Sequence, residues 1–366
     1  MDASEIAEYD IARNLSGKAV RSMCYAPHVD LYFDQWGKVR ACCRNRNFPI
    51  GDIAKDSIDA IWHGERLRLL RREVEAYSFA RGCEDCERQV ENGWLNSTNM
   101  QTFDQFDVEE PDPEWPRIIE LSISNSCNLE CVMCNGECSS AIRARREGRP
   151  ARPKYYPDNF ADSLRKYLAH ALRIKFLGGE PFLVPEYYRI WEMMIGDGLK
   201  THCHITTNGT QYNARIENIM ASLRVSLAVS IDGTTKETVE GIRVNADFDT
   251  LMANVRAFAA QAQSKNRTMA LTFCFMRQNW HEFGDFCLLA DALACRVVVN
   301  QVSSPPQFGV YNLPLDELRT VRDAMARQAP ILEPRLGANL SVWQRELERM
   351  RVKVRQLEKW EEDWPF

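Results

Sequence analysis

Three cysteines lie close together in the run Cys127-Asn-Leu-Glu-Cys131-Val-Met-Cys134. The C-x3-C-x2-C spacing places three thiolates in one short loop, with no fourth cysteine at C-x2-C spacing. Thiolates are protein ligands of iron–sulfur clusters, and three of them hold a four-iron cluster while its fourth iron stays open. A structural metal is normally closed by four protein ligands. The loop therefore predicts a cluster that does chemistry at an open iron.

A zinc site or a disulfide would also fit cysteines at this spacing. Cys138 lies four residues after Cys134 and could complete a tetrahedral zinc site. A disulfide would need an oxidising compartment, but nothing else in the sequence indicates secretion. The first twenty residues are acidic and lack the basic start and apolar core of a signal peptide.

A second group of cysteines lies in the first hundred residues. Cys24, Cys42, Cys83 and Cys86 could together close a second metal centre, in which the adjacent Cys43 could replace Cys42. The C-x2-C pair would also suit a zinc knuckle. The remaining cysteines stand singly among apolar residues, where a buried core role is expected: Cys203, Cys274, Cys287 and Cys295.

Composition narrows the class of protein. The 366 residues allow two domains, or one large barrel with an appendage. A hydrophobic share of 45% and a charged share of 27% are ordinary for a globular protein. A formal net charge of -5 argues against a broad nucleic-acid-binding surface. No run approaches the roughly 20 apolar residues of a membrane span. We expect a cytoplasmic protein with neither nucleic acid nor membrane as partner.

The elements that must position the cysteines alternate between strand and helix patterns after residue 117. Six strands alternating with helices predict a parallel sheet with right-handed crossovers. The length, roughly 190 residues, suits a partial (β/α)6 barrel of the TIM type, with a doubly wound open sheet as the alternative. The expected strands are Ile118–Ser124, Ile174–Leu177, His204–Thr207, Val225–Ile231, Met269–Phe275 and Arg296–Val302, and the expected helices are Asp158–Leu172, Pro185–Ile195, Ala214–Leu223, Phe248–Gln263 and Trp280–Ala294.

Four motifs follow the carboxyl ends of consecutive predicted strands. The cysteine loop follows the first, Gly178-Gly-Glu-Pro181 the second, Thr206-Thr-Asn-Gly209 the third and Ser230-Ile-Asp-Gly233 the fourth. Functional loops of parallel α/β folds follow those ends. Each motif alone is an ordinary turn former. Together they predict an active site on one rim of the sheet.

The section before residue 103 is expected to form a small unit of its own. Val29–Phe33 and Lys38–Cys42 read as a hairpin, and Ser57–Val74 as an amphipathic helix. Little apolar material remains for a core, so a metal would stabilise it. Residues 103–116 are acidic and proline-rich, which predicts a linker. Beyond residue 314 we expect a helix over Leu315–Gln328 and a charged helical tail over Leu340–Trp360, packed on the barrel rather than forming a coiled coil.

These residues together resemble the radical S-adenosylmethionine (radical SAM) superfamily, over residues 118 to about 314. The run CNLECVMC is similar to its cluster loop and Gly178-Gly-Glu-Pro181 to its motif for the amino group of SAM. The ends at Asn208 and Asp232 are similar to its ribose- and carboxylate-binding positions. Met133 departs from the pattern, because the family usually has an aromatic residue there, beside the adenine.

The N-terminal section resembles the auxiliary-cluster modules called SPASM and twitch domains. It has Cys24, twelve residues, Gly37, four residues, Cys42, and later Cys83-x2-Cys86. Such modules normally follow the barrel, but this one precedes it and is short, which favours one auxiliary cluster. The expected domains are an auxiliary [4Fe–4S] domain over 1–102, a linker over 103–116, the radical SAM barrel over 117–314 and a helical extension over 315–366.

The resemblance implies that Cys127, Cys131 and Cys134 hold a [4Fe–4S] cluster whose open iron binds SAM. An external one-electron reductant of the flavodoxin or ferredoxin type would start the reductive cleavage of SAM. The resulting 5′-deoxyadenosyl radical would take a hydrogen atom from the substrate. The implied SAM contacts are Gly178, Gly179 and Glu180 for the amino group, Thr207, Asn208, Ser230 and Asp232 for the ribose, and Arg243 for the carboxylate.

The reaction type stays open at this stage. A second cluster closed by Cys24, Cys42, Cys83 and Cys86 would accept an electron and favour net oxidation of a small molecule. Isomerisation or epimerisation, and modification of a precursor peptide, are the alternatives within the enzyme class. A zinc-binding interaction protein with an inactive barrel is the alternative outside it. For Arg243 the alternative role is a surface salt bridge, and for Asp232 it is a turn cap.

Overall fold

The computed structural model describes residues 1–15, 17–93, 95 and 99–363. The chain divides into two compact units. The first unit comprises Met1–Asn125, Arg152–His204 and Ser222–Arg224, and the second comprises Ser126–Ala151, Ile205–Ala221 and Val225–Phe366. No helix in the described ranges has both the length and the apolar composition that crossing a bilayer requires. The domain bounds expected from the sequence stay a prediction.

The sheet of the first unit joins the N-terminal section to the first strands of the predicted barrel. Its order is β3-β2-β1-β4-β5, followed by the first half of β6. The predicted hairpin is confirmed, because β1 and β2 pair antiparallel. Strand β1 also pairs parallel with β4, with Asp30 opposite Ile118 and Phe33 opposite Leu121. The strands are β1 (Asp30–Phe33), β2 (Lys38–Arg40), β3 (Gly51–Asp52), β4 (Ile118–Leu121), β5 (Arg173–Phe176) and β6 (His202–Thr207).

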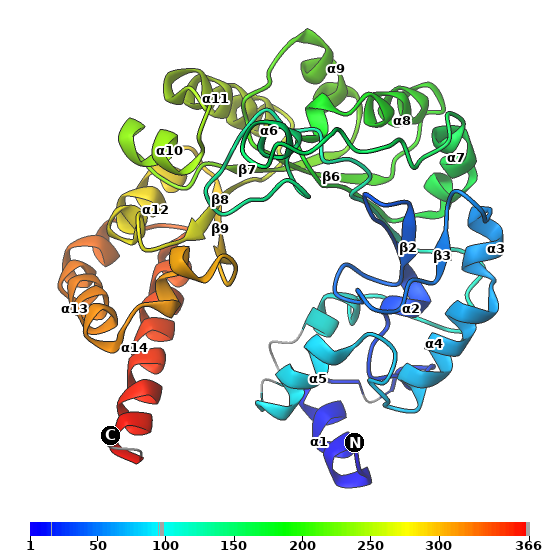
Figure 1. Cartoon of the computed structure of the whole chain (residues 1–366), viewed down its shortest axis with the longest axis horizontal. Helices are drawn as coiled ribbons and strands as arrows, with labels where there is room; N and C mark the ends of the chain where they lie inside the picture. The colour runs from blue at the N-terminus through cyan, green and yellow to red at the C-terminus, as the bar shows by residue number, and fades with distance from the viewer. Residues whose placement is uncertain (16, 94, 96–98, 364–366) are drawn as a thin grey trace. The chain divides into compact units, whose positions relative to one another are not determined.

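Helices cover the strands of this unit, and α7 and α8 lie side by side (Figure 1). The single helix expected over Ser57–Val74 is instead two helices, α3 and α4, because Gly64 has extended backbone and caps α4. Residues 104–117 contain no helix or strand. The helices are α1 (Ala3–Ala12), α2 (Ala26–Val29), α3 (Ile58–Trp62), α4 (Glu65–Glu75), α5 (Glu84–Glu91), α7 (Phe160–His170) and α8 (Pro185–Gly196), with 3-10 turns at Asn99–Phe103 and Pro181–Leu183.

The second unit continues the alternation of strands and helices. The second half of β6 is followed by β7 (Val225–Ser230), β8 (Met269–Phe275) and β9 (Arg296–Gln301). Strands β7, β8 and β9 pair in parallel. Its longer helices are α9 (Ala214–Ser222), α11 (Phe248–Ser264), α12 (Phe283–Ala292), α13 (Leu315–Leu332) and α14 (Leu340–Asp363), and its shorter ones are α6 (Ser140–Arg145), α10 (Lys236–Ile242) and 3-10 turns at Trp280–Glu282, Pro306–Phe308, Val310–Asn312 and Glu333–Arg335.

The C-terminal helix α14 packs beside α13 (Figure 1). Trp343, Leu347, Met350 and Val354 are buried along one face of it, at the spacing of three or four residues that a helix requires. This face explains the apolar positions in the charged tail.

Within each unit, the strands between residues 118 and 301 lie in the sheet in the same order as in the chain. A helix follows each of them, as in a (β/α) barrel, whereas the strand order of a doubly wound sheet reverses at a switch point. The predicted α/β fold of the partial-barrel type is confirmed, and five of the six predicted strands are shifted at an end by one to three residues while β8 matches in full.

Candidate functional site

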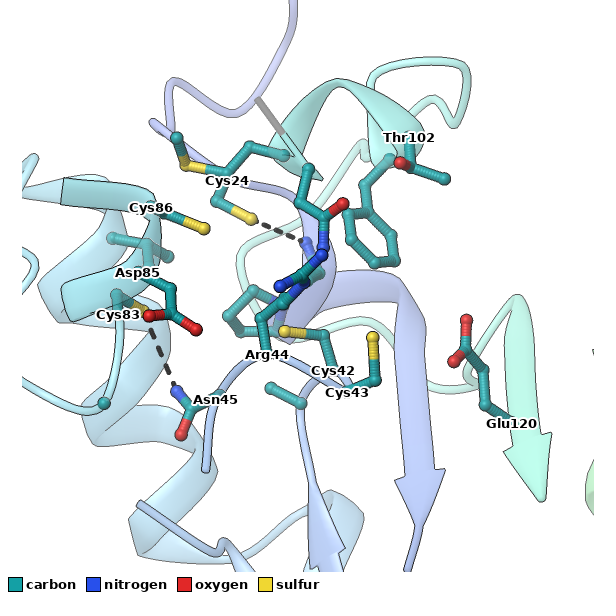
Figure 2. A pocket seen from close by; sticks show the side chains of 18 of the residues that line it. Cys24, Cys42, Cys43, Arg44, Asn45, Cys83, Asp85, Cys86, Thr102 and Glu120 are labelled. Atoms are coloured by element: carbon teal, nitrogen blue, oxygen red, sulfur yellow. Dashed lines mark hydrogen bonds between the residues drawn. The ribbon is translucent and has the colours of Figure 1, made fainter. Parts of the chain in front are cut away.

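Four cysteines of the first unit line one cavity of about 310 Å³: Cys24, Cys42, Cys83 and Cys86. Figure 2 shows their side chains placed around a common space, although they come from three separate segments. Cys43 also lines the cavity and lies beside Cys42, on the side of Glu120. The structure thus brings together the four thiols that were expected to form the auxiliary site.

Local backbone features hold these thiols in place. Cys42 follows strand β2, and the hairpin before it turns at Gly37, which has a φ of +74°. Cys83 caps helix α5 and Cys86 lies in its first turn. Gly82 before them has a φ of +75°, and a Cβ there would come within 2.5 Å of Asn45 Oδ1. Glycine is therefore required where the two cysteine segments meet.

Asn45 is a site residue that sequence reasoning missed. Its amide Nδ2 donates to Arg81 O at 2.9 Å and to Cys83 Sγ at 3.7 Å. Its Oδ1 accepts the Phe48 N–H at 3.2 Å. The buried amide therefore ties the loop after Cys42 to the loop before Cys83. No motif signals it, because a single asparagine near cysteines is an ordinary loop residue.

The donor set of this cavity suits an iron–sulfur cluster. Burial raises the pKa of all four thiols. The pKa of Cys83 rises to about 12, first because of burial and second because of the charge of Cys86. Such thiols ionise only when a metal's charge compensates them. The Ala26 N–H donates to Cys24 Sγ at 3.5 Å, a contact of the kind that tunes cluster sulfurs. Among the described residues, no three His, Cys, Asp or Glu side chains converge as they would around one metal ion.

The three-cysteine loop lies in the second unit and is anchored by its backbone. The N–H groups of Glu130 and Val132 donate to Val244 O and Ile242 O, each at 2.9 Å. Cys127 N–H donates to Ser140 Oγ at 3.1 Å. Leu129, Cys131 and Ala246 form a small buried cluster against which Cys127, Met133 and Cys134 pack. The loop is therefore held against the segment that follows helix α10.

Two polar side chains reach cysteine sulfurs in this loop. Asn208 Nδ2 lies 3.8 Å from Cys127 Sγ, and an Arg243 guanidinium nitrogen lies 3.8 Å from Cys131 Sγ. Asn208 also donates to Asn128 Oδ1 at 3.0 Å. The structure thus brings the residue after β6 and the residue after α10 to the cysteine loop. Donors near cluster sulfurs are features that shift cluster potentials.

Arg243 is buried, with 6% of its surface exposed, so the surface salt bridge considered for it is wrong. It forms an ion pair of 2.6 Å with Asp232, which has a φ of +69° and is fully buried. Burial lowers the pKa of Arg243, but the Asp232 carboxylate outweighs it and leaves that pKa above its ordinary value. Among the described residues, Arg243 Nε has no hydrogen-bond partner. A buried N–H group of this kind can donate a hydrogen bond to an oxygen atom of a ligand.

Cys274 lies beside this ion pair. Its N–H donates to Asp232 Oδ1 at 2.6 Å. Burial raises the pKa of its thiol, and the Asp232 charge adds to that shift. A buried core role was expected for the four single cysteines. Cys203, Cys287 and Cys295 are buried, whereas Cys274 is half-buried.

Two further side chains of the second unit fix the end of β7, and sequence reasoning missed both. Asn279 donates to Asp232 O and to Cys274 O, each at 2.9 Å, and accepts the Met276 N–H at 2.9 Å. Glu282 accepts hydrogen bonds from Thr234 and Thr235 in the loop after Gly233 and from Thr238 in helix α10. Of the other expected residues, Thr207 accepts the Gly209 N–H at 3.1 Å and Ser230 ends β7, half-buried.

The glycines of the predicted SAM-amino motif lie in the first unit. Gly178 and Gly179 have φ values of +74° and +53°. A Cβ at Gly178 would come within 2.5 Å of Ser122 Oγ, so packing against the end of β4 already requires a glycine. Glu180 is fully buried, and its carboxylate accepts the Phe182 N–H at 3.0 Å.

Comparison with known proteins adds two family matches. A model described as the radical SAM superfamily matches residues 121–290, and one described as a SPASM iron–sulfur cluster-binding domain matches residues 24–87. The three-cysteine loop falls within the first match, and Cys24, Cys42, Cys83 and Cys86 fall within the second.

The chain is similar to several curated proteins and solved structures. It is 32% identical over 129 residues to an AdoMet-dependent heme synthase of Methanosarcina barkeri, covering 35% of this chain and 34% of that protein. It is 26% identical over 180 residues to the mycofactocin maturase MftC of Mycobacterium tuberculosis, covering 48% and 42%. Streptococcus suis SuiB bound to its precursor peptide SuiA matches with a TM-score of 0.42 and 17% identity, covering 68% and 59%. The aligned part thus spans well under half of each of these two curated relatives.

Proposed function

We propose that this chain, a radical SAM protein with a SPASM-type iron–sulfur domain before its radical SAM domain, is an enzyme. The reaction we propose is the net oxidation of a small molecule. Its cofactors are SAM, the [4Fe–4S] cluster that binds it and an auxiliary cluster. One observation carries the proposal. Four thiols expected to ligate a cluster line a single cavity, which supports a closed auxiliary cluster.

Cys127, Cys131 and Cys134 would hold the SAM-binding cluster. When bound, the cluster and SAM supply a one-electron cleavage that yields a 5′-deoxyadenosyl radical, with the electron drawn from an external reductant of the flavodoxin or ferredoxin type. The chain's own residues orient these groups. Asn208 and Arg243 bring positive N–H groups to the sulfurs of Cys127 and Cys131. Leu129 and Cys131 are buried, and the half-buried Cys127 and Cys134 pack against them.

The buried ion pair refines the proposed SAM contacts. Asp232 holds Arg243, so we assign it to orienting the guanidinium rather than to the ribose. The unpartnered Nε–H of Arg243 would donate a charge-assisted hydrogen bond to the SAM carboxylate. Thr207, Asn208 and Ser230 remain the ribose candidates. Gly178, Gly179 and Glu180 remain those for the amino group.

The auxiliary cysteines favour a reaction class, net oxidation. A cluster closed by four thiolates has no iron left to bind substrate, and it is suited to taking an electron. A substrate radical that loses one electron and one proton is oxidised by two electrons relative to the starting substrate. Epimerisation instead needs a hydrogen-atom donor, and the half-buried Cys274 is the candidate that the structure offers for that alternative.

The test uses anaerobically reconstituted protein. We expect about eight irons per chain, and 5′-deoxyadenosine when SAM and dithionite are added. Cys131→Ala should abolish 5′-deoxyadenosine, because it removes a ligand of the SAM-binding cluster. Cys203→Ala, which changes a buried strand cysteine of the first unit, is the control. Stoichiometric zinc with almost no iron would instead support the zinc-binding alternative and end this proposal.

A second candidate is modification of a precursor peptide, favoured by the similarity to MftC, which is named a maturase. Mass spectrometry separates the two candidates. A mass loss of two hydrogens on a small metabolite supports the first, and the same loss on a peptide encoded beside this chain supports the second.

A further inference from the structure

The cavity of the auxiliary cysteines has a polar side that the cysteines do not explain. Glu120, Lys175 and His204 line it, together with Leu177. These polar residues come from β4, β5 and β6, which are consecutive strands. Glu120 lies opposite Lys175 in the β4–β5 register. The cavity thus joins a group of thiols to a row of polar side chains on the sheet.

Glu120 and Lys175 form an ion pair inside this cavity. The Glu120 side chain is 5% exposed and that of Lys175 is 19% exposed. Burial lowers the pKa of Lys175, but the Glu120 carboxylate outweighs it and leaves that pKa raised. The two groups compensate each other's charge within this ion pair. A buried pair of this kind stabilises a fold poorly, because desolvation offsets the attraction.

Asp30 adds an unsatisfied group next to the pair. It is fully buried on β1, and neither of its carboxylate oxygens has a hydrogen-bond partner among the described residues. Burial first, and the Glu120 charge second, raise its pKa well above the ordinary value. Unsatisfied polar groups buried beside a cavity mark a place where a ligand or water belongs.

The charges of the polar side balance, which restricts its ligand. His204 is neutral, because burial first and Lys175 second lower its pKa to about 4. The charges of Glu120 and Lys175 cancel within their ion pair. A charged ligand would bring an unpaired charge into this buried side, at high cost. A hydroxyl group can donate to a Glu120 oxygen and accept from Lys175 Nζ without disturbing that balance.

We propose that Glu120 and Lys175 form a subsite that binds a hydroxyl group of an uncharged part of the substrate, beside the auxiliary cysteines. The apolar residues Met100, Phe103 and Leu177 also line the cavity and would contact the carbon skeleton. This subsite rests on the proposed oxidation, because it places an alcohol carbon next to the closed cluster. The subsite therefore implies that the substrate is an alcohol.

The experiment follows deuterium from carbon-deuterated probes into 5′-deoxyadenosine by mass spectrometry, on fully reconstituted protein. The probes are the uncharged polyols glycerol and erythritol, and the matched control is glycerol trimethyl ether deuterated at the same carbons as glycerol, which has no O–H group. We expect transfer from at least one hydroxyl probe and none from the ether. Glu120→Gln should reduce that transfer about tenfold or more, because a neutral amide replaces a charged acceptor.

Further variants separate binding from folding. Glu120→Gln leaves Lys175 without its partner, so the double variant Glu120→Gln with Lys175→Gln keeps the subsite neutral. It should also lose transfer while retaining iron content and the signals of both clusters in electron paramagnetic resonance. Asp59→Asn removes the exposed ion pair of Asp59 with Lys166 in the same unit and should change nothing.

The outcomes distinguish this subsite from the proposed function. Absence of 5′-deoxyadenosine in the wild type would overturn the proposed function itself. Normal 5′-deoxyadenosine without deuterium from either hydroxyl probe, or equal transfer from the ether, would overturn the hydroxyl assignment alone. Wild-type transfer in both Glu120 variants would overturn the role of Glu120 and Lys175.

Discussion

Individual side chains in this protein act mainly by holding other groups in place. Asn45 joins two cysteine segments of the first unit, and Asp232 holds Arg243 beside Cys131 in the second. Both are buried polar residues whose hydrogen-bonding or charged groups face specific partners. Removing one partner of such an arrangement costs more than the pair contributes, since the other stays buried and unsatisfied.

The neighbouring cysteines Cys42 and Cys43 offer a matched pair of variants. Figure 2 shows Cys42 among the other three thiols and Cys43 on the side of Glu120. Cys42→Ala should therefore lower iron from about eight to about four per chain, because one four-iron cluster loses a ligand. Cys43→Ala should keep its full iron content. Iron and sulfide analysis measures both variants. The reverse pattern would identify Cys43 as the cluster ligand. An equal loss of iron in the two variants would mean that both cysteines are needed to hold the cluster.

His28 predicts a pH dependence of stability. It is buried in α2, and burial lowers its pKa from 6.5 to about 4, although Glu75 lies 3.6 Å from its Nε2. The unfolded chain takes up a proton below about pH 6.5 while the folded chain does not, so stability falls as pH drops from 6.5 to 4. The expected slope is about 1.4 kcal/mol per pH unit.

Urea unfolding of the wild type and of His28→Gln at several pH values measures this slope. The variant should lose that part of the slope, and His63→Gln, which changes an exposed histidine, should keep it. An unchanged slope in His28→Gln would show that His28 is protonated in the folded protein.

At the scale of elements, the predicted strands and motifs were placed well because their signals are local. Apolar runs identify each strand, and glycine or cysteine spacing identifies the loop after it. What was missed depends on contacts between distant segments. Asn279 and Glu282 are single polar residues after β8, and each forms a hydrogen bond with a residue after β7 that is more than forty positions away in the chain. Nothing in their own surroundings distinguishes them from surface residues.

Asn279 is expected to affect SAM binding indirectly, by supporting Asp232 and Arg243 rather than by contacting SAM. Its amide connects the end of β7 to the turn after β8, so Asn279→Ala removes three hydrogen bonds and leaves buried groups unsatisfied. We expect a loss of about 2 kcal/mol in unfolding free energy, and weaker SAM binding because Asp232 and Arg243 lose their support. Urea unfolding and calorimetric titration with SAM measure the two effects.

Gln278→Ala is the control for this prediction, since Gln278 is the exposed neighbour in the chain. It should leave both quantities unchanged. Reduced stability of Asn279→Ala with wild-type SAM affinity would restrict Asn279 to a structural role.

At the scale of the whole molecule, the N-terminal section shares a sheet with the strand that precedes the cysteine loop. The sequence predicted its hairpin but not the parallel pairing of β1 with β4, since strand partners are not written in local periodicity. All four residues of β4 are buried, so β4 needs a neighbouring strand on each side to cover it. The small section expected to depend on a metal is also stabilised by this pairing.

Removal of residues 1–102 should therefore damage the remaining chain rather than release a free barrel. The deletion would uncover β4 as an edge strand and expose the side chains packed against Leu31 and Phe33, which are fully buried. Unpaired apolar edges of this kind associate with one another. We expect residues 103–366 to aggregate on expression, and size-exclusion chromatography with circular dichroism measures this. A monomeric fragment that unfolds cooperatively and takes up about four irons would show instead that residues 103–366 fold without β1. The pairing of β1 with β4 would then serve to place the auxiliary cysteines rather than to stabilise the sheet.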